Sequence, residues 1–481
     1  LEHQVKVDKN TRFNIASNAK QFTALCILKL VEAGKMSLED DIRNYLPALF
    51  KGIEEKITIA NLINHTSGIR DYCDLISLTG KVWWKQFIDN DDVIEMMAAQ
   101  SGLNFKPGTA YGYSNSNYTL LTEVIKIVSG QEFSEFAKDM FEALDMPSTS
   151  YVTHYGMIIP YEARPYGNWG GWKEEPTITA VHGDGALYTN LSDQLQWEQI
   201  VRANDGKYLS KEIIQTSQAP IANSFTDTYG YGLMFDQHNG RDYTYHDGVT
   251  GAFNATFLRL PERISIVVMS GNRNVPANYL AWQIATKVLN FKEARYPENP
   301  EKTETLTDIQ EVLGYYKGKS NGAIIKIVEK EGSLYREMQQ RDPVKLIKEK
   351  DALFAYETIE GLKMNFRNIG QSEQQFTLYL SSQPPMTYQK LPNSVLQDFD
   401  GNDLNGRFYN AETETEIILK YQEGNTYSLT KNGREREAEL ILMDYLKMNS
   451  YEIKIIRDQS NNIIGLNVNY SRIGNVIFNK I

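Results

Sequence analysis

The segment from Lys20 to Ala33 constrains this chain most, because it is rich in helix formers and has hardly any polar face. Gly34 then ends the segment. The apolar residues that cover nearly every side of this helix are Phe22, Ala24, Leu25, Cys26, Ile27, Leu28, Leu30 and Val31. A helix of this kind is stable only when other elements surround it inside a sizeable protein. We therefore predict that it is a central, buried helix.

The overall composition is that of a globular protein that does not bind nucleic acid. The chain has 481 residues, enough for about two to four domains. Its formal net charge of -11 would repel a phosphate backbone, and no basic run with interleaved aromatics occurs. No stretch approaches the roughly 18 consecutive apolar residues of a membrane helix. We predict no nucleic-acid partner and no transmembrane segment.

Cysteines and histidines give no indication of a metal centre. Cys26 lies in the apolar helix and Cys73 in a predicted loop, which supports neither a disulfide framework nor a cysteine metal site. The six histidines form no His-x-x-x-His or similar pair. We predict no metal and no cofactor.

The first part of the chain changes from helical to strand-like patterns. Residues 36–180 mix short helices with proline-marked loops, which indicates a mainly helical subdomain. Strand-like runs follow at Tyr243 to His246, Ala255 to Leu260 and Ile264 to Met269, before a last helix from about Ala277 to Leu289. This order predicts an α+β domain over residues 1–291, with an antiparallel sheet flanked by helices.

The second part of the chain repeats itself. A charged stretch containing Pro297 and Pro300 predicts a linker over residues 292–306. Beyond it, Gly318 corresponds to Gly406, and other matching segments show offsets of 88 to 92 residues. Each copy has short strands separated by Gly, Asn and Asp turns. We predict two small antiparallel β-barrel-like modules, over residues 307–392 and 393–481.

Ser17 and Lys20 form the first candidate catalytic pair. Their spacing puts both side chains on one face of a helix, and the apolar surroundings would desolvate the lysine so that it can take the serine proton. The helix N-terminus adds a positive potential and free N–H groups for an oxyanion. The pattern by itself is weak, since it recurs at Ser428 to Lys431.

Tyr113 and Asn115 come just before an apolar helix that we predict over Thr119 to Val128. A phenol beside a lysine can carry protons to a leaving group. The amide of Asn115 can hold both the lysine and a substrate carbonyl. The Tyr-x-Asn spacing also occurs at 166–168 and 188–190, so spacing alone does not select these residues.

His246, Gly248 and Val249 lie at the end of a predicted strand. A histidine there can donate to the tyrosine or bind an anionic substrate group. Gly248 would let a substrate lie against the strand edge, and the N–H of Val249 could complete an oxyanion hole with that of Ser17. The alternative is a surface histidine in a hairpin.

Together and in this order, the three motifs resemble the superfamily of serine β-lactamases, penicillin-binding DD-peptidases and esterases, in particular its class-C-like branch. The resemblance covers about residues 1–290. The segments that carry it are 13–24, 34–41, 45–47, 62–69, 113–118, 183–187 and 246–253, with Asp193 and Trp197. The modules beyond residue 307 resemble the lipocalin-like barrels of D-aminopeptidases and related esterases.

The resemblance implies a role for each matching residue. Ser17 would be the nucleophile, Lys20 the general base and Tyr113 the proton shuttle. The substrate-binding residues would be Asn115, His246, Gly248 and Val249. His65 resembles a structural residue of the family.

Two features depart from the family pattern. The β-lactamases of this branch usually carry a lysine where His246 stands, and a histidine, mostly neutral at pH 7, would bind a substrate carboxylate less strongly. This departure is similar to certain DD-carboxypeptidases and D-aminopeptidases and favours peptidase or esterase chemistry. In addition, only 16 residues precede Ser17, so we expect either a trimmed sequence or a sheet that lacks an edge.

These features predict a serine hydrolase that forms an acyl-enzyme at Ser17 with an amide or ester substrate: a small D-amino acid peptide, an ester or a β-lactam. The alternative is a catalytically silent binding module whose C-terminal barrels capture a cell-wall fragment or an apolar ligand. A metal-dependent hydrolase is a third reading that the histidines do not support. By analogy with cell-wall enzymes we expect a periplasmic or secreted protein, although the visible residues contain no signal peptide. The residue that activates water for deacylation and the oligomeric state are not indicated.

Overall fold

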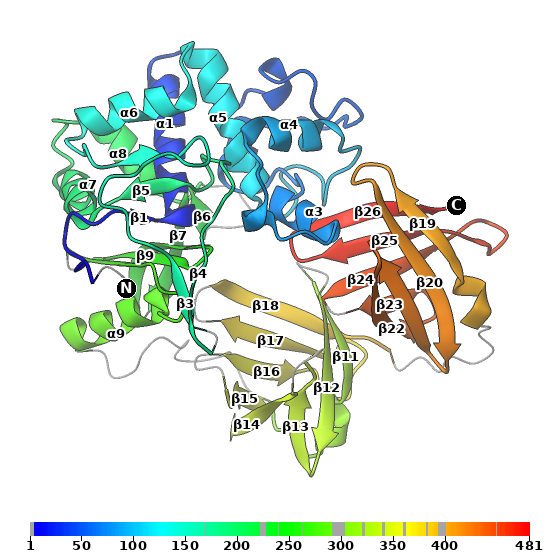
Figure 1. The fold of residues 1–481 in the computed structure, drawn as a ribbon. Helices are drawn as coiled ribbons and strands as arrows, with labels where there is room; N and C mark the ends of the chain where they lie inside the picture. Colours follow the sequence, from blue (N-terminus) through cyan, green and yellow to red (C-terminus); the bar gives the residue numbers. More distant parts are fainter. Residues whose placement is uncertain are drawn as a thin grey trace. The chain divides into compact units, whose positions relative to one another are not determined.

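The computed structural model describes residues 4–481 except 169, 222–227, 239, 262, 291–303, 320–322, 339–341, 359–361, 381–382, 393–400 and 449. The chain forms two compact units, each described here by itself (Figure 1). The first unit contains residues 1–73, 81–101 and 105–294. The second unit contains residues 74–80, 102–104 and 295–481.

Helices and short antiparallel sheets build the first part of the chain. The helices are α1 (Lys20–Glu32), α2 (Ile59–Ile63), α3 (Tyr72–Leu78), α4 (Asn90–Ala98), α5 (Asn115–Ser129), α6 (Phe133–Ala143), α7 (Leu191–Ala203), α8 (Lys211–Ser217) and α9 (Ala277–Leu289). The shorter 3-10 turns are η1 (Ala16–Ala19), η2 (Ile42–Asn44) and η3 (Trp83–Lys85).

A five-stranded antiparallel sheet with the order β10-β9-β8-β7-β6 is the framework of the first unit. Its strands are β6 (Tyr229–Gly230), β7 (Leu233–His238), β8 (Arg241–Thr250), β9 (Phe253–Leu260) and β10 (Ile264–Ser270). A three-stranded sheet, β1-β5-β2, joins β1 (Phe13–Asn14), β5 (Leu187–Thr189) and β2 (Ser150–Tyr151), and β3 (Tyr166–Asn168) pairs with β4 (Trp172–Glu174).

Helix α1 is buried, as the apolar pattern predicts. Its Phe22 ring packs against Phe141 of α6 and Trp197 of α7, with ring centroids 5.3 and 5.4 Å apart. On another side the turn between β6 and β7 comes so near that a Cβ on Gly232 would lie 2.3 Å from the backbone N of Gln21. The prediction of a central helix is confirmed.

Strand β8 presents different chemistry to its two sides, because alternate side chains point to opposite faces of a sheet. Tyr243 and Tyr245 belong to a hydrophobic cluster with Trp282 of α9. His246 is 1% exposed and Gly248 packs against the turn that precedes α1. One face of the strand therefore supports α9 and the other supports the start of α1.

Two sequence-based details differ from the structure. Strand β8 pairs with β9 as far as Thr250, so His246 lies within the strand and is not the surface histidine of the alternative reading. The helix predicted over Thr119 to Val128 begins one turn earlier, at Asn115, because the carboxylate of Asp71 accepts the N–H of that residue at 2.6 Å. A cap supplied from a distant segment leaves no local sequence signal.

The second unit contains two closed eight-stranded barrels, as the repeat predicts. The strands of the first barrel are β11 (Gly314–Gly318), β12 (Ile324–Lys330), β13 (Ser333–Arg336), β14 (Val344–Lys350), β15 (Leu353–Tyr356), β16 (Lys363–Arg367), β17 (Gln375–Leu380) and β18 (Gln383–Lys390). Those of the second are β19 (Gly406–Asn410), β20 (Thr415–Glu423), β21 (Thr426–Lys431), β22 (Arg434–Leu442), β23 (Tyr445–Met448), β24 (Tyr451–Arg457), β25 (Ile463–Tyr470) and β26 (Ile473–Lys480). The 3-10 turns η4 (Ile309–Val312) and η5 (Gly401–Leu404) precede the barrels.

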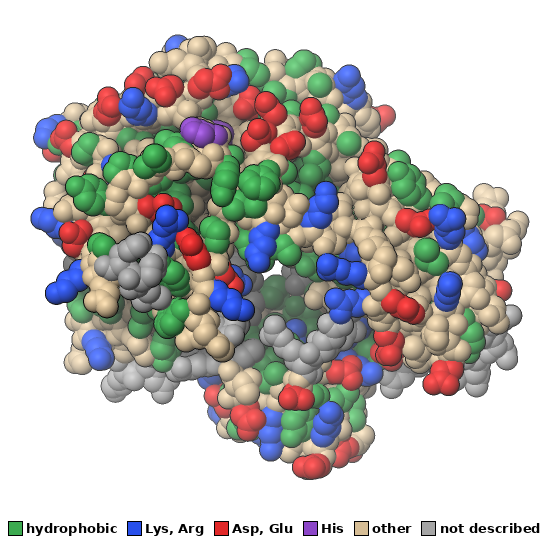
Figure 2. Space-filling view, in the orientation of Figure 1, with side chains coloured by type: hydrophobic (Ala, Val, Ile, Leu, Met, Phe, Trp, Pro, Cys, Tyr) green, Lys and Arg blue, Asp and Glu red, His purple; other side chains and the backbone are tan. Residues whose placement is uncertain are grey.

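Aromatic side chains fill the first barrel. Tyr316, Phe366 and Phe376 pack on one another with ring centroids 4.9 to 6.0 Å apart, and Phe376 stacks on Tyr388. In the space-filling view, Lys, Arg, Asp and Glu side chains of both signs are scattered over the visible face, with hydrophobic side chains between them (Figure 2). The aromatics of this barrel are core residues, as expected.

The predicted boundaries between domains remain predictions. Most of the predicted linker, residues 292–303, lies outside the described residues. The second unit also takes in residues 74–80 and 102–104, where the Asp74 carboxylate pairs with Arg472 at 3.0 Å and Asn104 accepts the N–H of Gly474 at 2.6 Å. In the part of the chain that the structure describes, no helix combines the length and apolar character needed to cross a membrane.

Candidate active site

Ser17 occupies the turn between β1 and α1. Ala16 before it has a φ of +46°, in the left-handed region that costs an alanine roughly 1–2 kcal/mol. The side-chain oxygen of Asn14 supports this turn by accepting the N–H of Ala16 at 2.9 Å. Ser17 is partly exposed while its neighbours on both sides are buried. The turn thus presents one hydroxyl to the outside.

Lys20 lies one helical turn after Ser17 and is fully buried. Its Nζ is 3.1 Å from the hydroxyl oxygen of Ser17, as the helical spacing predicts. The same nitrogen donates to Oδ1 of Asn115 at 2.8 Å and to the carbonyl of Asp184 at 2.7 Å. Three oxygen atoms from three segments therefore surround the amine.

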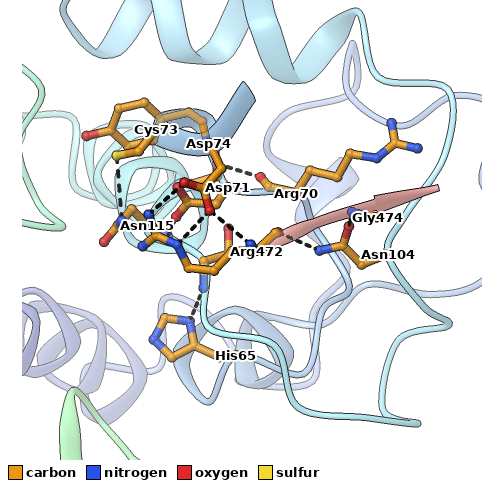
Figure 3. A network of polar contacts seen from close by, with 12 residues as sticks. His65, Arg70, Asp71, Cys73, Asp74, Asn104, Asn115, Arg472 and Gly474 are labelled. Carbon is orange, nitrogen blue, oxygen red and sulfur yellow. Dashed lines mark hydrogen bonds and ion pairs between the residues drawn. The ribbon is translucent and has the colours of Figure 1, made fainter. Parts of the chain in front are cut away.

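Asn115 is held in place by residues around the start of α3. Its backbone N–H donates to Asp71, and its side-chain Nδ2 lies 3.7 Å from the sulfur of Cys73 (Figure 3). These contacts direct Oδ1 of the amide toward Lys20. Cys73 is buried, as is Cys26, and burial raises the pKa of the Cys26 thiol to about 12.

Tyr113 lies beside the lysine, with its ring centroid 5.0 Å from Nζ of Lys20. The imidazole of His65 packs on this ring at 4.2 Å between centroids. Nδ1 of His65 also accepts the N–H of Ser114 at 3.2 Å (Figure 3). His65 therefore supports the segment that carries Tyr113, which agrees with its expected structural role.

His246 is a buried, neutral histidine. Its Nδ1 is 2.7 Å from the carbonyl of Asp247, which makes Nδ1 the protonated nitrogen, and Nε2 can then accept the hydroxyl of Tyr229 at 3.3 Å. Burial first, and the charge of Lys20 second, lower the pKa of His246 to about 3. At neutral pH this side chain therefore carries no charge with which to bind an anion.

Gly248 and Val249 lie next to the turn that carries Ser17. A Cβ on Gly248 would come within 2.2 Å of the carbonyl oxygen of Ile15, so the glycine is needed for β8 to approach the turn before Ser17. The side chain of Val249 is 58% exposed. Strand β9 pairs with β8 as far as Thr250, whereas β7 pairs with it only up to Tyr245. The residues of β8 after Tyr245 are therefore not paired with β7 on the side opposite β9. This edge is where a substrate could pair with the strand.

Asp184 and Tyr72 also contact the site, although no sequence motif gives either residue a role. The hydroxyl of Tyr72 donates to the carboxylate of Asp184 at 3.1 Å, while the backbone carbonyl of the same aspartate holds Lys20. Burial raises the pKa of Asp184 to about 6, although the charge of Lys20 and the bond from Tyr72 both favour the ionised form. The sequence signal for Asp184 was its place in segment 183–187, one of the segments that carry the family resemblance, and Tyr72 had none.

The structure brings the predicted site residues into one region of the first unit. The contacts above connect Ser17, Lys20 and Asn115 directly, and the rings of Tyr113 and His246 lie 6.3 Å apart. Among the described residues, no group of three or more His, Cys, Asp or Glu side chains could hold a metal ion. The chemistry that this arrangement can perform is proton transfer between a serine and a lysine next to a stretch of β8 that β7 does not pair with.

The Beta-lactamase family model matches residues 1–288, so this chain belongs to the β-lactamase family of serine enzymes and penicillin-binding proteins. The chain is 30% identical over 281 residues to the protein PbpX of Bacillus subtilis (strain 168), which covers 56% of this chain and 64% of PbpX. It is 25% identical over 357 residues to Penicillin-binding protein 4* of the same strain, covering 68% of this chain and 77% of that protein.

A solved structure of a penicillin binding protein from Bacillus halodurans is 26% identical and gives a TM-score of 0.52, covering 60% of this chain and 88% of the other. This chain spans less than two thirds of the length of PbpX. The family and the fold support a serine hydrolase.

Proposed function

We propose that this protein hydrolyses an amide or ester through an acyl-enzyme on Ser17, with Lys20 as the base. The observation that carries the proposal is the 3.1 Å contact between the Ser17 hydroxyl and Nζ of a fully buried lysine. A serine at its ordinary pKa is a weak nucleophile and needs such a partner.

The contacts of Lys20 provide a geometry for proton transfer from Ser17. A neutral amine has two N–H donors and one lone pair. Asn115 and the carbonyl of Asp184 can accept the two N–H bonds, which leaves the lone pair for the hydroxyl proton of Ser17. As Oγ attacks the substrate carbonyl, the proton passes to Nζ, and the ammonium then has an acceptor for each of its hydrogens.

The later steps use the residues around this pair. The backbone N–H groups of Ser17 and Val249 would bind the oxyanion of the tetrahedral intermediate. Tyr113, 5.0 Å from Nζ, would relay the proton from Lys20 to the leaving amine or alcohol. Water then hydrolyses the ester bond to Ser17 and regenerates the enzyme.

The substrate that we propose is a D-amino acid peptide or an ester, with β-lactams as reactive analogues. Two relatives carry penicillin binding in their names. The uncharged His246 supports peptidase or esterase action rather than strong binding of a β-lactam carboxylate. The same analogy with cell-wall enzymes supports a location outside the cytoplasm.

The competing reading of a silent binding module has less support. It requires a barrel interior that can accept a ligand, whereas the first barrel is packed with aromatic side chains. It also leaves the contact between Ser17 and Lys20 without a purpose. We therefore favour catalysis.

Covalent labelling tests the proposal. The full chain is incubated with a fluorescent penicillin and, separately, with a p-nitrophenyl ester, and its intact mass and its proteolytic peptides are measured. We expect an adduct on the peptide that contains Ser17, or ester turnover, and neither in Ser17→Ala. The lifetime of the adduct then separates a penicillin-binding peptidase, with a persistent adduct, from an esterase or β-lactamase. A folded chain with no adduct and no turnover would overturn the proposal.

A further inference from the structure

Residues at the start of α3 support the two groups that accept hydrogen bonds from Lys20. The carboxylate of Asp71 accepts the backbone N–H of Asn115 at 2.6 Å, and the hydroxyl of Tyr72 donates to the carboxylate of Asp184 at 3.1 Å. The side chain of Asn115 and the backbone carbonyl of Asp184 in turn accept from Nζ of Lys20 at 2.8 and 2.7 Å. The position of α3 therefore affects the oxygen atoms around the lysine.

Helix α3 needs contacts with other elements to hold this position. It has seven residues, and helices shorter than about 12 residues are marginal in water without tertiary packing. The helix is shared by the two units, because Tyr72 and Cys73 belong to the first and the residues from Asp74 onward belong to the second. Contacts made within the second unit can therefore fix a helix whose first residues support the site.

An ion pair holds the second half of α3 to the barrel formed by β19 to β26, which we call the second barrel. Arg472 lies in the turn between β25 and β26. It directs three donors to the carboxylate of Asp74, namely its backbone N–H at 2.9 Å, Nε at 3.0 Å and Nη2 at 3.4 Å (Figure 3). Both carboxylate oxygens of Asp74 are contacted, so the arginine fixes the orientation of this side chain as well as its distance.

Further hydrogen bonds support the same arrangement. Asn104 accepts the N–H of Gly474 at 2.6 Å and donates to the carbonyl of Arg472 at 2.9 Å, so it steadies the turn that carries the arginine. Asn432, in the turn between β21 and β22, donates to the carbonyl of Thr79, the residue after α3. Two separate turns of the second barrel therefore contact the end of α3.

The ion pair is explained better by geometry than by stability. The side chain of Asp74 is 9% exposed, so its charge is largely removed from water. Desolvation of two charges can cost as much as their attraction gains, and a largely buried ion pair is therefore weak evidence for stability. A pair with fixed orientation does, however, define where the helix lies.

We propose that Arg472 is a positioning residue of the active site, which acts through Asp74 and α3 on the groups that hold Lys20. The second barrel then takes part in catalysis through the ion pair that it supplies. This inference rests on the proposed function, because the placement of Lys20 matters to the reaction only if Lys20 is the base for Ser17.

Three variants of the full chain test this role: Arg472→Gln, Asp74→Asn and the two combined. Pre-steady-state kinetics with p-nitrophenyl acetate give the acylation rate constant and the ester concentration at which acylation is half-saturated. In Arg472→Gln we expect the rate constant to fall by about 10-fold to 100-fold, because displaced reacting groups slow the chemistry. The half-saturating concentration should change by less than about threefold, since ester binding does not depend on the base.

The double variant shows whether the two residues act as a unit. It should lose no more activity than the more damaged single variant, because both substitutions remove one contact. It also leaves neither charge buried without its partner, so it guards against misfolding of the single variants. The matched control is Arg457→Gln, which breaks a 2.8 Å ion pair with Asp444 in the same barrel and should leave the acylation rate constant within about twofold.

Thiol labelling follows α3 itself. Cys73 lies on this helix, 3.7 Å from Nδ2 of Asn115, and Cys26 lies in α1, and both thiols are buried. In Arg472→Gln, Cys73 should react with a thiol reagent about tenfold faster than in the wild type, because α3 opens more often, while Cys26 keeps its rate. An unchanged rate at Cys73, or an equal increase at both thiols, would overturn the part assigned to α3.

The activity measurements separate this role from the proposed function. Wild-type acylation in Arg472→Gln and in the double variant would overturn the positioning role and leave the serine hydrolase in place. Losses that multiply in the double variant would also overturn it, because the two residues would then act separately. A wild-type chain with no ester turnover and no adduct on Ser17 would instead overturn the proposed function itself.

Discussion

The chain contains the same Ser-x-x-Lys spacing in two structural settings, and only one of them brings the two side chains together. Ser17 and Lys20 lie on a helical segment, where a separation of three residues puts them on one face and 3.1 Å apart. Ser428 and Lys431 lie on strand β21, where an odd separation directs the side chains to opposite faces of the sheet. Ser428 donates to Glu435, and Lys431 donates to the hydroxyl of Tyr451 at 2.9 Å. A separation of three residues can therefore bring a serine and a lysine together on a helix, but it cannot do so on a β-strand.

The largest expected effect concerns the two serines. Ser17→Ala should lower kcat/KM for a p-nitrophenyl ester by about 10⁴-fold, because it removes the proposed nucleophile. Ser428→Ala should change it by less than about twofold. Steady-state kinetics on both purified variants check this prediction. Comparable losses in the two variants would mean that the helical pair is not the catalytic one.

Replacing Lys20 should lower activity more than replacing Lys431, but the difference should be smaller than that between the two serines. Lys20→Met keeps the hydrophobic stem and removes the proposed base, so kcat should fall by about 10³-fold. Lys431→Met is the matched control and should leave kcat within about twofold. The pre-steady-state acylation rate is the decisive measurement, since it reports proton removal from Ser17. An acylation rate that survives in Lys20→Met would assign the base to another group.

Next to the Ser17 and Lys20 pair lies the buried His246, and it should make the stability of the first unit depend on pH. No buried histidine accompanies Ser428 and Lys431 among the described residues of the second unit. The native pKa of about 3 lies below the ordinary value of 6.5, so below pH 6.5 the unfolded chain binds a proton that the folded chain does not. Between pH 6.5 and pH 4 the wild type should lose about 3 kcal/mol more than His246→Gln.

Calorimetric unfolding at the two pH values measures this difference. His154→Gln serves as the control, because His154 is exposed. Parallel pH dependence in the wild type and His246→Gln would show that the folded protein protonates this histidine in the ordinary range.

The smallest effect concerns how fast the side-chain amines of Lys431 and Lys20 react with an acylating reagent. Burial lowers the pKa of Lys431 to about 8. At pH 8 its neutral fraction is well above that of an ordinary lysine, so an amine-reactive acylating reagent should label it about tenfold faster than exposed lysines. Lys20, with no exposed surface, should remain unlabelled. Peptide mapping of the labelled full chain measures both sites. Modification of Lys20 before Lys431 would contradict the prediction.

Local pattern accounts for the elements that were predicted well. The apolar run after Lys20 corresponds to α1, the segment from Ala277 to Leu289 is α9, and the repeat of 88 to 92 residues corresponds to two closed barrels. Hydrophobic period and turn residues act over a few positions, so they can be read directly. The length of α5 was underestimated because its first N–H is capped by Asp71, 44 positions away.

Within the site, residues that belong to the ordered motifs could be predicted, whereas residues that contact them from other segments could not. Ser17, Lys20, Tyr113, Asn115 and His246 occur in recognisable motifs, and the structure places them together. Asp184 lies in segment 183–187, which carries part of the resemblance without a role for this residue, and Tyr72 and Tyr229 lie in no motif, so their contacts were not predicted. The neutral state of His246 also depends on burial that no local pattern reveals.

The sequence by itself determined the helix, the strands of the barrels and the relative placement of Ser17 and Lys20, because the geometry of one helical turn sets that distance. Only the tertiary structure decided that Asn115 and Asp184, 95 and 164 positions from Lys20, would supply its two other oxygen partners. The physical reason is that contacts between distant segments depend on how the helices and the sheet pack, and packing depends on the whole chain at once.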